Sequence, residues 1–577
     1  MAASDAPAAG GQRRAGAWMV AITVLVFAPT LALRRVAYDD PWLWSDTSPL
    51  RAPSMAVLRH VWLELDARAR HDLGTEYLPV RDMVVAADMA MWGARSGNES
   101  WNESWTERGP HATQLALYAL TVLGLGGLLV RFGLRRELAW LATLVWAIHP
   151  IHVESVAWLS ERKGVLAGLG AIACGHAWIR YRRGGGWGWV LAGAAAAVAA
   201  TWSKAPAMFA PAVFAAWDLL VLPAGRRRWI AIAAIGGAAA LAAIPVVVVA
   251  RGAGVVDSAL EVAPDGRLTS ALGALGHYAL SLVLARSPSL SYPIQTEGAG
   301  PAELVLGAAA VIGSLALAAI PRGPGRAWRR ALLAWTWIWF LPISHLLAVV
   351  HIVVADRFAY LWSLGGCAGA AWLVLQLRGP ARLAVAGALV CTLGVASLRA
   401  EAAWTSSIEL FTRGLAASPG DPVACQRLAG ELFGAGQRVE ALAVIDRGLA
   451  RHPDHPYLLA DGARMLAELG RPAEALVRSE RAARSGHAST LALHAELLAV
   501  AGRRSEAVAF AERAARRRPE VAAYTEAWVE LLLALGRRDE AEAAARDHLA
   551  RDPGPASARL LGRVFSAGRA ASVDDRR

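Results

Sequence analysis

Residues 146–166 read WAIHPIHVESVAWLSERKGVL and lie between two long apolar runs. Within 15 positions this stretch holds two histidines, two glutamates, an arginine and a lysine. Ionisable side chains next to an apolar run are costly unless they pair with one another or line a water-filled cavity. The stretch therefore predicts a functional site where a membrane-spanning helix begins or ends.

The chain as a whole is apolar enough for a polytopic membrane protein. Of its 577 residues, 55% are hydrophobic and only 18% are charged, a balance more apolar than a soluble domain needs. A helix that crosses the hydrocarbon core takes about 20 apolar residues. Eleven apolar runs are candidate spans: 16–33, 111–131, 137–150, 165–180, 187–202, 205–222, 229–250, 302–320, 330–348, 358–377 and 383–398. We therefore predict an all-α fold, with a polytopic membrane domain of about 11 spans over residues 1–400 and an outer loop at 34–110.

Basic clusters predict the sides of the membrane. With Arg13 and Arg14 in the cytoplasm, every second connection between spans is short and rich in arginine, as the positive-inside rule requires. These connections are 131–136, 180–183, 226–228, 322–330 and 378–382. Segments 54–71 and 268–286 are interpreted as helices that lie in the outer membrane surface or re-enter the membrane from it. This topology places the N terminus in the cytoplasm and the C terminus outside.

A different pattern begins near residue 400. The stretches GQRVEAL, GRPAEAL, GRRSEAV and GRRDEAE begin at Gly436, Gly470, Gly502 and Gly536, so they repeat at intervals of 34, 32 and 34 residues. The pattern resembles the tetratricopeptide repeat, in which glycine forms the turn between two helices and a small alanine lies where they cross closely. We predict a tetratricopeptide-repeat (TPR) α-solenoid over residues 401–555, followed by a disordered tail at 556–577. The stacked helix pairs should form a concave groove that binds a peptide or protein.

The charge and cysteine content argue against two common functions. The net charge is +12, but the arginines lie in short clusters and not along one polar face, so no nucleic-acid partner is predicted. Three of the four cysteines lie inside apolar runs and the fourth stands alone, which leaves neither a disulfide framework nor a CxxC metal site. His149 and His152 lack a third ligand, so a hydrogen-bonding role is predicted for them and no metal is assigned. A divalent cation held by carboxylates of the first loop is an open alternative.

Four polar stretches fall on the predicted outer side of the membrane. They are YDDPWLWSD at 38–46, HPIHVESVAWLSERKG at 149–164, WSKAP at 202–206 and VADRFAYL at 354–361. Asp39 or Asp40 could act as a general base, and Asp39 is preferred because Asp40-Pro41 also suits a turn that stops a helix. Lys163 and Lys204 are the only lysines in the chain, and a compact ammonium group suits the contact with a phosphate.

These groups combine into one predicted site. Cationic side chains would hold a phosphate at headgroup depth, and carboxylates would pair with them. The predicted substrate-binding residues are His149, His152, Glu154, Arg162, Lys163, Lys204, Asp356 and Arg357. A carboxylate base beside a phosphate clamp suits transfer from a phosphate-linked donor to a hydroxyl group. On the outer side no soluble nucleotide is available, so a lipid-linked sugar phosphate is the predicted donor.

Three of these motifs resemble those of a known family. The runs HPIHVESVAWLSERKG, YDDPWLW and ADRFAYLWSLG resemble the transmembrane and tetratricopeptide-repeat (TMTC-like) protein O-mannosyltransferases of the glycosyltransferase C (GT-C) superfamily, and spans followed by repeats match over nearly the whole chain. The resemblance implies inverting transfer of a sugar from a polyprenyl phosphate to serine or threonine. It also implies that Asp39 or Asp40 occupies the catalytic acidic position, and that segments 160–164, 203–206 and 355–358 line the donor site. This chain has ERKG where relatives commonly have GRKD, and DRFAYLWS in place of ERYLYLPS.

The composition, rich in arginine and alanine, indicates a bacterial member of this family. The resemblance then implies a multi-pass protein of the inner membrane in contact with membrane lipid, with periplasmic repeats that present an acceptor and undecaprenyl phosphate as the carrier. Bacterial members need not use mannose or modify proteins, so the hexose and the acceptor, protein or glycan, stay open. Two other functions stay open as well. One is an oligosaccharide ligase or polymerase, and the other is a non-catalytic membrane scaffold whose repeats recruit partners for the assembly of envelope polysaccharide or protein.

Overall fold

The protein forms two compact units, Met1–Ala417 and Ser418–Arg577. The structure, a computed structural model, describes residues 6–44, 48–52, 54–66, 70, 73–92, 108–252, 264–286, 289–290, 292–321, 325–347, 352–519, 521–551 and 555–574. Over these residues the secondary structure is helical and contains no strand. The predicted all-α class is therefore confirmed for the described part of the chain.

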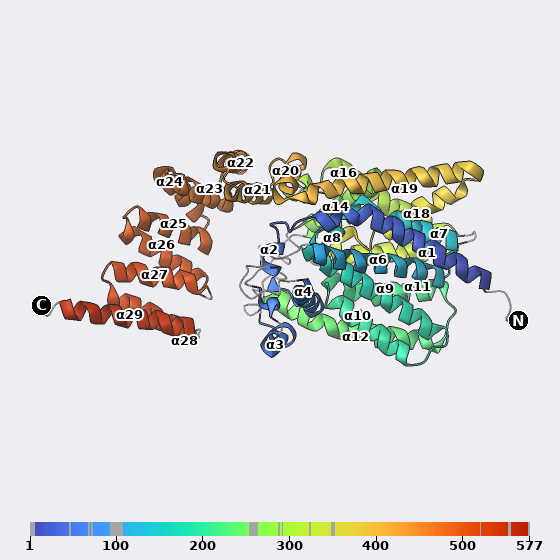
Figure 1. The fold of residues 1–577 in the computed structure, drawn as a ribbon, viewed down its shortest axis with the longest axis horizontal. Helices are drawn as coiled ribbons and strands as arrows, with labels where there is room; N and C mark the ends of the chain where they lie inside the picture. Colours follow the sequence, from blue (N-terminus) through green and yellow to red (C-terminus); the bar gives the residue numbers. More distant parts are fainter. Residues whose placement is uncertain are drawn as a thin grey trace. The chain divides into compact units, whose positions relative to one another are not determined.

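The first unit is a bundle of apolar helices with shorter helices between them (Figure 1). Its α-helices are α1 (Ala6–Phe27), α2 (Asp40–Leu43), α3 (Met55–Leu63), α4 (Pro79–Trp92), α6 (Arg108–Arg131), α7 (Arg136–Ala147), α8 (Val153–Ala157), α9 (Arg162–Arg182), α10 (Gly188–Thr201), α11 (Ala210–Val221), α12 (Arg226–Gly252), α14 (Pro264–Leu284), α15 (Pro293–Thr296), α16 (Pro301–Ala319), α17 (Arg326–Phe340), α18 (Leu364–Gln376), α19 (Gly379–Glu401) and α20 (Ser407–Ala417). Short 3-10 helices η5 (Leu159–Glu161), η6 (Ala205–Phe209) and η8 (Asp356–Ala359) carry part of the polar sequence discussed below.

Five helices of this unit are long and apolar enough to cross a membrane. Their apolar stretches are Arg14–Ala32, Arg108–Arg131, Arg226–Gly252, Pro301–Ala319 and Gly379–Thr405. Helices also occupy the other six predicted spans, but these helices are shorter or more polar. For example, α7 has 12 residues and reaches only about 18 Å at 1.5 Å per residue, whereas the hydrocarbon core is about 30 Å thick. The prediction of 11 spans is thus supported for five helices only.

Large apolar side chains cover the outside of this bundle. Trp18, Leu25, Leu241, Val305 and Leu383 lie on candidate spans and are each more than 60% exposed. In a membrane protein lipid covers large exposed apolar side chains of this kind. This surface is compatible with membrane association.

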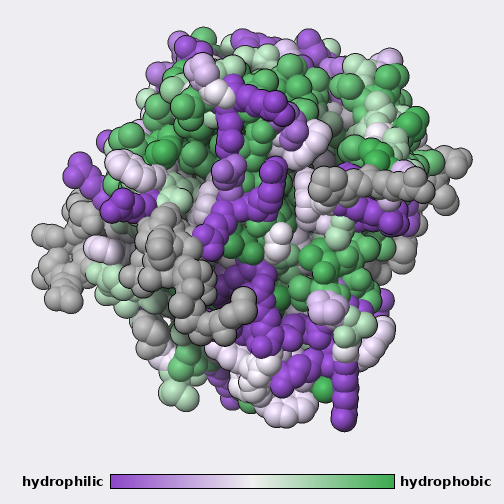
Figure 2. All heavy atoms as spheres, turned by 90° about the vertical axis from the view of Figure 1, so that its right-hand side faces the viewer, coloured by the Kyte–Doolittle hydropathy of each residue, from purple (hydrophilic) through white to green (hydrophobic). Residues whose placement is uncertain are grey.

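Polar groups gather at two ends of the bundle. At one end the predicted cytoplasmic connections contact one another, because Arg183 donates to the carbonyl of Arg131 at 2.5 Å and Arg227 donates to that of Tyr181 at 2.7 Å. Figure 2 looks onto the side of the N terminus and shows a band of hydrophilic side chains with hydrophobic ones on both sides. The helices α2, α3 and α4 lie at the opposite end (Figure 1). Two polar ends around an apolar middle are what a bundle of spanning helices requires.

The segment 268–286, predicted to be a helix that lies in the membrane surface or re-enters the membrane, forms most of α14, which packs along α16. The two backbones approach closely at glycines. A Cβ atom added at Gly276 would lie 1.8 Å from the Glu303 carbonyl oxygen, and one at Gly307 would lie 2.1 Å from that of Leu272. Small residues at such contacts are typical of helix pairs in membranes.

Replacing Gly276 by alanine is therefore expected to force α14 and α16 apart and to lower the thermal stability of the full chain in detergent. The added methyl group meets backbone, which cannot rotate away, so a cost of about 1–3 kcal/mol is expected. Gly313→Ala on α16 is the matched control, because a Cβ atom there meets nothing within 4 Å. Equal melting temperatures for the two variants would refute this close contact.

The second unit consists of stacked antiparallel helix pairs. Its helices are α21 (Pro422–Gly434), α22 (Arg438–Arg451), α23 (Pro456–Glu468), α24 (Pro472–Ala483), α25 (Ala488–Val500), α26 (Arg504–Arg517), α27 (Ala522–Ala534), α28 (Arg538–Arg551) and α29 (Pro555–Asp574). The four repeated glycines have φ values of +73° to +81° at the turns between paired helices, a conformation that favours glycine. The alanines five residues later, Ala441, Ala475, Ala507 and Ala541, are all fully buried. The predicted repeats are confirmed.

The structure adds detail at both ends of the predicted repeat range, 401–555. The compact second unit begins at Ser418, and α20 packs with the first unit: Leu410 is part of its hydrophobic core and the Ser407 hydroxyl accepts from the Ala37 amide at 2.9 Å. The tail 556–577, predicted to be disordered, contributes to α29, which buries Leu560 and Val564 in the last repeat.

Candidate functional site

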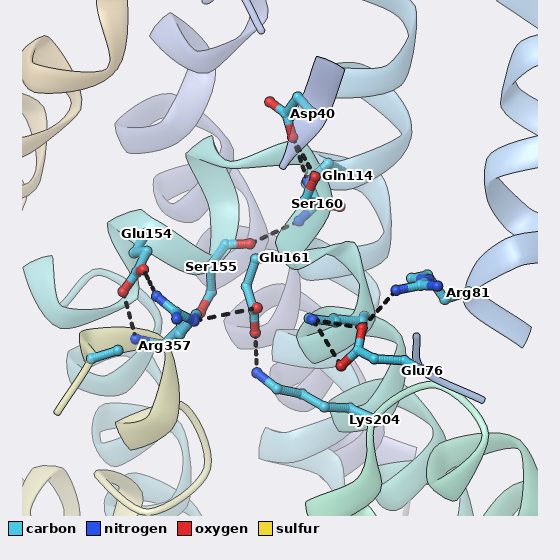
Figure 3. Close-up of polar contacts among 12 residues, drawn as sticks. Asp40, Glu76, Arg81, Gln114, Glu154, Ser155, Ser160, Glu161, Lys204 and Arg357 are labelled. Atoms are coloured by element: carbon cyan, nitrogen blue, oxygen red, sulfur yellow. Dashed lines mark hydrogen bonds and ion pairs between the residues drawn. The ribbon is translucent and has the colours of Figure 1, made fainter. Parts of the chain in front are cut away.

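The four polar stretches meet with part of the outer loop at one end of the first unit (Figure 3). Asp40 begins α2, and its carboxylate accepts hydrogen bonds from the Val36 amide at 3.1 Å and from the Ser160 amide and hydroxyl at 3.0 and 2.5 Å. Burial raises the pKa of Asp40 to about 6. The three hydrogen bonds, first of all the one from the Ser160 hydroxyl, act to lower this pKa but do not outweigh burial. Asp40 is buried and accepts hydrogen bonds from three donors, so it links the first loop to η5.

Asp39 differs from its neighbour. It is partly exposed, and its side chain makes no hydrogen bond to any residue that the structure describes. The residues on both sides of it contact the 158–160 segment, since Asp40 bonds Ser160 and the Tyr38 ring lies 5.3 Å from the Trp158 ring. Of the two predicted carboxylates, Asp39 is therefore the one available to a ligand.

Lys163 is paired with a carboxylate from the outer loop. Its Nζ lies 3.0 and 3.2 Å from the two carboxylate oxygens of Glu76, which also accepts from Arg81 at 2.8 Å. Burial acts to raise the pKa of Glu76, but Lys163, Arg81 and Lys204 outweigh it and lower that pKa to about 2. Glu76 is thus an anion that is already bound between cations of the site.

Lys204 and Arg357 surround a second carboxylate. Lys204 donates to Glu161, and the Arg357 Nε lies 3.9 Å from the other oxygen of Glu161, which has no hydrogen-bond partner among the described residues. The Arg357 amide and guanidinium both donate to Glu154, the amide at 2.9 Å. Burial lowers the pKa of Lys204, while Glu161 acts to raise it. Glu154 thus pairs with Arg357, whereas Glu161 pairs mainly with Lys204.

Arg162 is one of the predicted substrate-binding residues that the structure places away from the open pocket, where only Lys204 and Arg357 of the predicted set lie. Its guanidinium is fully buried and donates to Asp88, to Gln114 at 3.1 Å and to the Pro110 carbonyl at 2.5 Å. These contacts join α9 to α4 and α6. The side chain therefore holds three helices together and offers no donor to a ligand in this structure.

The two histidines are buried and hydrogen-bonded. His149 accepts from the Ile151 amide at 3.2 Å and its Nε2 lies 3.0 Å from the Leu282 carbonyl. His152 lies 3.3 Å from the Ser363 hydroxyl, and its ring packs 4.7 Å from that of Trp146. They therefore position the segment 149–153, and no group of three or more metal-ligating side chains occurs within the described residues.

Asp356 is a buried carboxyl next to a carboxylate. It accepts a hydrogen bond from the Tyr292 hydroxyl, which itself accepts from the Ser289 amide at 2.8 Å. Burial, and after it the charge of Glu154, raises the pKa of Asp356 to about 7. Ser289 and Tyr292 are thereby attached to η8.

A shift from about pH 8 to about pH 6 is expected to stabilise the protein through Asp356. Because its pKa rises from 3.8 to about 7 on folding, the folded chain binds this proton more tightly than the unfolded chain, and the stability so gained is lost as the pH rises through 7. The melting temperature of the original protein in detergent, relative to that of Asp356→Asn, should therefore increase as the pH falls from 8 to 6. Because asparagine cannot ionise, a difference between the two proteins that stays constant over this range would contradict the assignment.

A pocket of about 450 Å³, part of it open, lies beside these pairs. Lys204 and Arg357 provide its cationic side. Its apolar and aromatic walls come from Ala167, Ala207, Trp339, Ile343, Phe358, Leu361 and Trp362. Lys163 does not line the pocket, but the next residue in the chain, Gly164, does. The pocket can therefore take a ligand that carries an anion next to an apolar group.

Sequence reasoning missed several residues of this site. They are Glu76, Arg81, Asp88, Gln114 and Tyr292. Most of them lie in or beside the outer loop, where no periodic pattern or motif marks a single polar side chain. Charge balance gave no signal either, because the motifs already supplied at least as many carboxylates as the four predicted cations required.

The chain thus combines an apolar helical bundle, which carries a charged pocket, with a helical repeat unit. The comparison with protein families assigns the repeats: the family described as "Tetratricopeptide repeat" matches residues 398–460. The chain is therefore a TPR-containing protein. No curated protein matches the sequence.

Three solved structures of TPR proteins are similar to parts of the chain. The TPR protein YrrB, described as having an unusual peptide-binding site, is 18% identical with a TM-score of 0.25, over 28% of this chain and 85% of its own. The protein TTC0263 of Thermus thermophilus is 25% identical with a TM-score of 0.24, over 31% of this chain and 94% of its own. The P58(IPK) TPR domain is 11% identical with a TM-score of 0.20, over 67% of this chain and 95% of its own. At these TM-scores the three likenesses carry no further argument.

Proposed function

We propose that this protein is a membrane glycosyltransferase that moves a hexose from a polyprenyl-phosphate donor to a hydroxyl group of an extracytoplasmic protein or glycan, with inversion. The supporting observation is the pocket in which Lys204 and Arg357 face aromatic and aliphatic walls. A lipid phosphate complements both parts of this pocket, because its anion suits the cations and its apolar chain suits the apolar walls. Guanidinium and ammonium groups are the usual partners of phosphate in proteins.

In the proposed reaction Asp39 accepts the proton of the acceptor hydroxyl. The freed oxygen attacks the anomeric carbon of the sugar, and the bond from this carbon to the phosphate oxygen breaks. The electron pair leaves with the polyprenyl phosphate, whose growing negative charge Lys204 and Arg357 stabilise. Attack on the face opposite the leaving group inverts the anomeric centre.

The remaining assignments follow from this reaction. The donor is a lipid-linked sugar phosphate in the membrane, undecaprenyl phosphate being the proposed carrier, and the TPR unit presents a periplasmic acceptor peptide or protein. The proposed setting is the bacterial inner membrane, with the N terminus in the cytoplasm and the TPR unit in the periplasm. A need for a divalent cation is tested by adding a chelator to the assay.

The direct test of this function is turnover by the full chain in proteoliposomes. Synthetic polyprenyl-phosphate hexoses are supplied with acceptor proteins from the same cell envelope, and mass spectrometry follows hexose transfer. We expect a hexose on serine or threonine, or on a glycan, and free polyprenyl phosphate. If only a diphosphate-linked donor is consumed, the protein is an oligosaccharide ligase or polymerase. If no donor is consumed while partners still bind the repeats, it is a scaffold.

A further inference from the structure

A second pocket lies at the opposite end of the same helices from the candidate site. Its space, with the solvent at its open mouth included, is about 680 Å³, and it is lined by Arg131, Arg180 and Arg183, together with Ile179, Gly185 and Trp189. Arg131 follows Gln114 of the first site by 17 positions in α6, which corresponds to about 25 Å at 1.5 Å per residue. This distance approaches the thickness of the hydrocarbon core, about 30 Å. We propose that this pocket binds the phosphate headgroup of an anionic membrane lipid in the leaflet opposite the candidate active site.

The three arginines of this pocket, here called the arginine pocket, form no ion pair with a carboxylate among the described residues. The nearby Asp218 is already shared by Arg182 at 2.6 Å and Arg228 at 2.9 Å. Arg131 instead contacts the Nδ1 of His176 at 3.0 Å, and that histidine is fixed by its other nitrogen, 2.9 Å from the Gly124 carbonyl. The positive charge of the arginine pocket is therefore available to an external anion.

The loop between α9 and α10 gives this pocket a defined shape. Arg227 donates to the Gly185 carbonyl at 2.7 Å, and Arg183 donates to that of Arg131 at 2.5 Å. A Cβ atom at Gly185 would lie 2.5 Å from the Trp189 ring and 2.8 Å from the Arg180 carbonyl, so the Trp189 ring lies directly on the loop backbone. The Arg180 guanidinium lies 5.7 Å from the centre of the same ring. The three cations are thus held around one opening by different contacts: Arg183 by a backbone carbonyl, Arg131 by His176 and Arg180 by the Trp189 ring.

The surroundings of the arginine pocket favour a lipid over a soluble phosphate. Trp187 and Trp189 expose 64% and 41% of their surface beside it, and Leu191, further along α10, exposes 70%. Tryptophan is enriched at the level of lipid headgroups. These exposed apolar side chains can contact acyl chains while the arginines hold the headgroup. Basic pockets between spanning helices are typical sites for anionic headgroups.

The test measures lipid binding by the full chain in detergent. Short-chain phosphatidylglycerol is the probe, phosphatidylcholine is the neutral comparison, and native mass spectrometry counts the bound lipid. We expect one phosphatidylglycerol to bind preferentially, and Arg180→Gln/Arg183→Gln to weaken this binding by about tenfold or more, since two charge-assisted contacts are lost. Arg135→Gln/Arg136→Gln is the control with the same change in charge, because both arginines are exposed at the same end and outside the pocket.

Three results would overturn the proposal. They are equal binding of the neutral and anionic lipids, equal weakening by the pocket and control variants, and displacement of the lipid by inorganic phosphate at similar concentration, which would assign the pocket to a soluble phosphate. A melting curve of each variant separates loss of binding from loss of fold. The binding test does not depend on hexose transfer, so it can succeed even if the proposed glycosyltransferase function fails.

Discussion

Replacing Asp39 by asparagine is expected to reduce hexose transfer by about 10²–10⁴-fold, because general-base catalysis typically contributes this much. The substitution keeps the shape of the side chain. Asp39 is partly exposed and makes no side-chain hydrogen bond within the described residues, so the variant should fold and melt like the original protein. The initial rate with a polyprenyl-phosphate hexose and the melting temperature are measured on the same preparation.

Asp40→Asn is the control for this result. Its two oxygens accept three hydrogen bonds from Val36 and Ser160, so an amide in its place should mainly lower the melting temperature. Any loss of activity in this variant should follow its loss of stability. Full activity of Asp39→Asn in a well-folded preparation would remove Asp39 from the proposed mechanism.

Replacing Arg162 by methionine is expected to be the most destabilising single change in the first unit. It removes the cation that pairs with Asp88 and the donor to Gln114 and to the Pro110 carbonyl. Breaking a buried pair from one side costs about 3–5 kcal/mol because a charge stays buried without a partner. Thermal or denaturant unfolding of the full chain in detergent measures this loss.

Two comparisons isolate the buried pair. Arg162→Met/Asp88→Asn removes both charges and should recover part of the loss. Arg413→Met breaks the exposed pair with Glu409, whose side chains are about half exposed, and should cost about 1 kcal/mol or less. A similar small loss for Arg162→Met would mean that this arginine does not hold α9 to α4 and α6.

The repeat unit could be predicted almost completely from sequence. The turns between its helices require glycine because φ is positive there, and the close helix contacts require alanine because the side chain is fully buried. Both residue types therefore recur at a fixed spacing that can be seen in the sequence. The apolar runs likewise predicted the positions of the helices. They did not predict helix length, because an apolar run can continue into a turn, as at residues 137–150, where α7 ends at Ala147.

The partners within the candidate site were less accessible to sequence reasoning. Motifs identified the cations Lys163, Lys204 and Arg357, yet the carboxylate that Lys163 contacts is Glu76, which comes from a loop 87 residues away. A single glutamate in a polar loop leaves no periodic signal. Sequence reasoning could not predict that Arg162 is buried away from the open pocket. The adjacent Lys163 carries the same charge but is partly exposed, and only the packing of the helices distinguishes the two residues.

Equilibrium binding of a polyprenyl-phosphate hexose to the full chain tests the central claim most directly. Lys204→Gln should fold, because the Lys204 side chain is partly exposed and Glu161 keeps Arg357 at 3.9 Å. We predict about tenfold or weaker donor binding for this variant, from the loss of one charge-assisted contact. Arg59→Gln, which removes an exposed arginine of α3, should leave the affinity unchanged. Equal donor affinity in Lys204→Gln and the original protein would contradict the claim that Lys204 and Arg357 form a phosphate site.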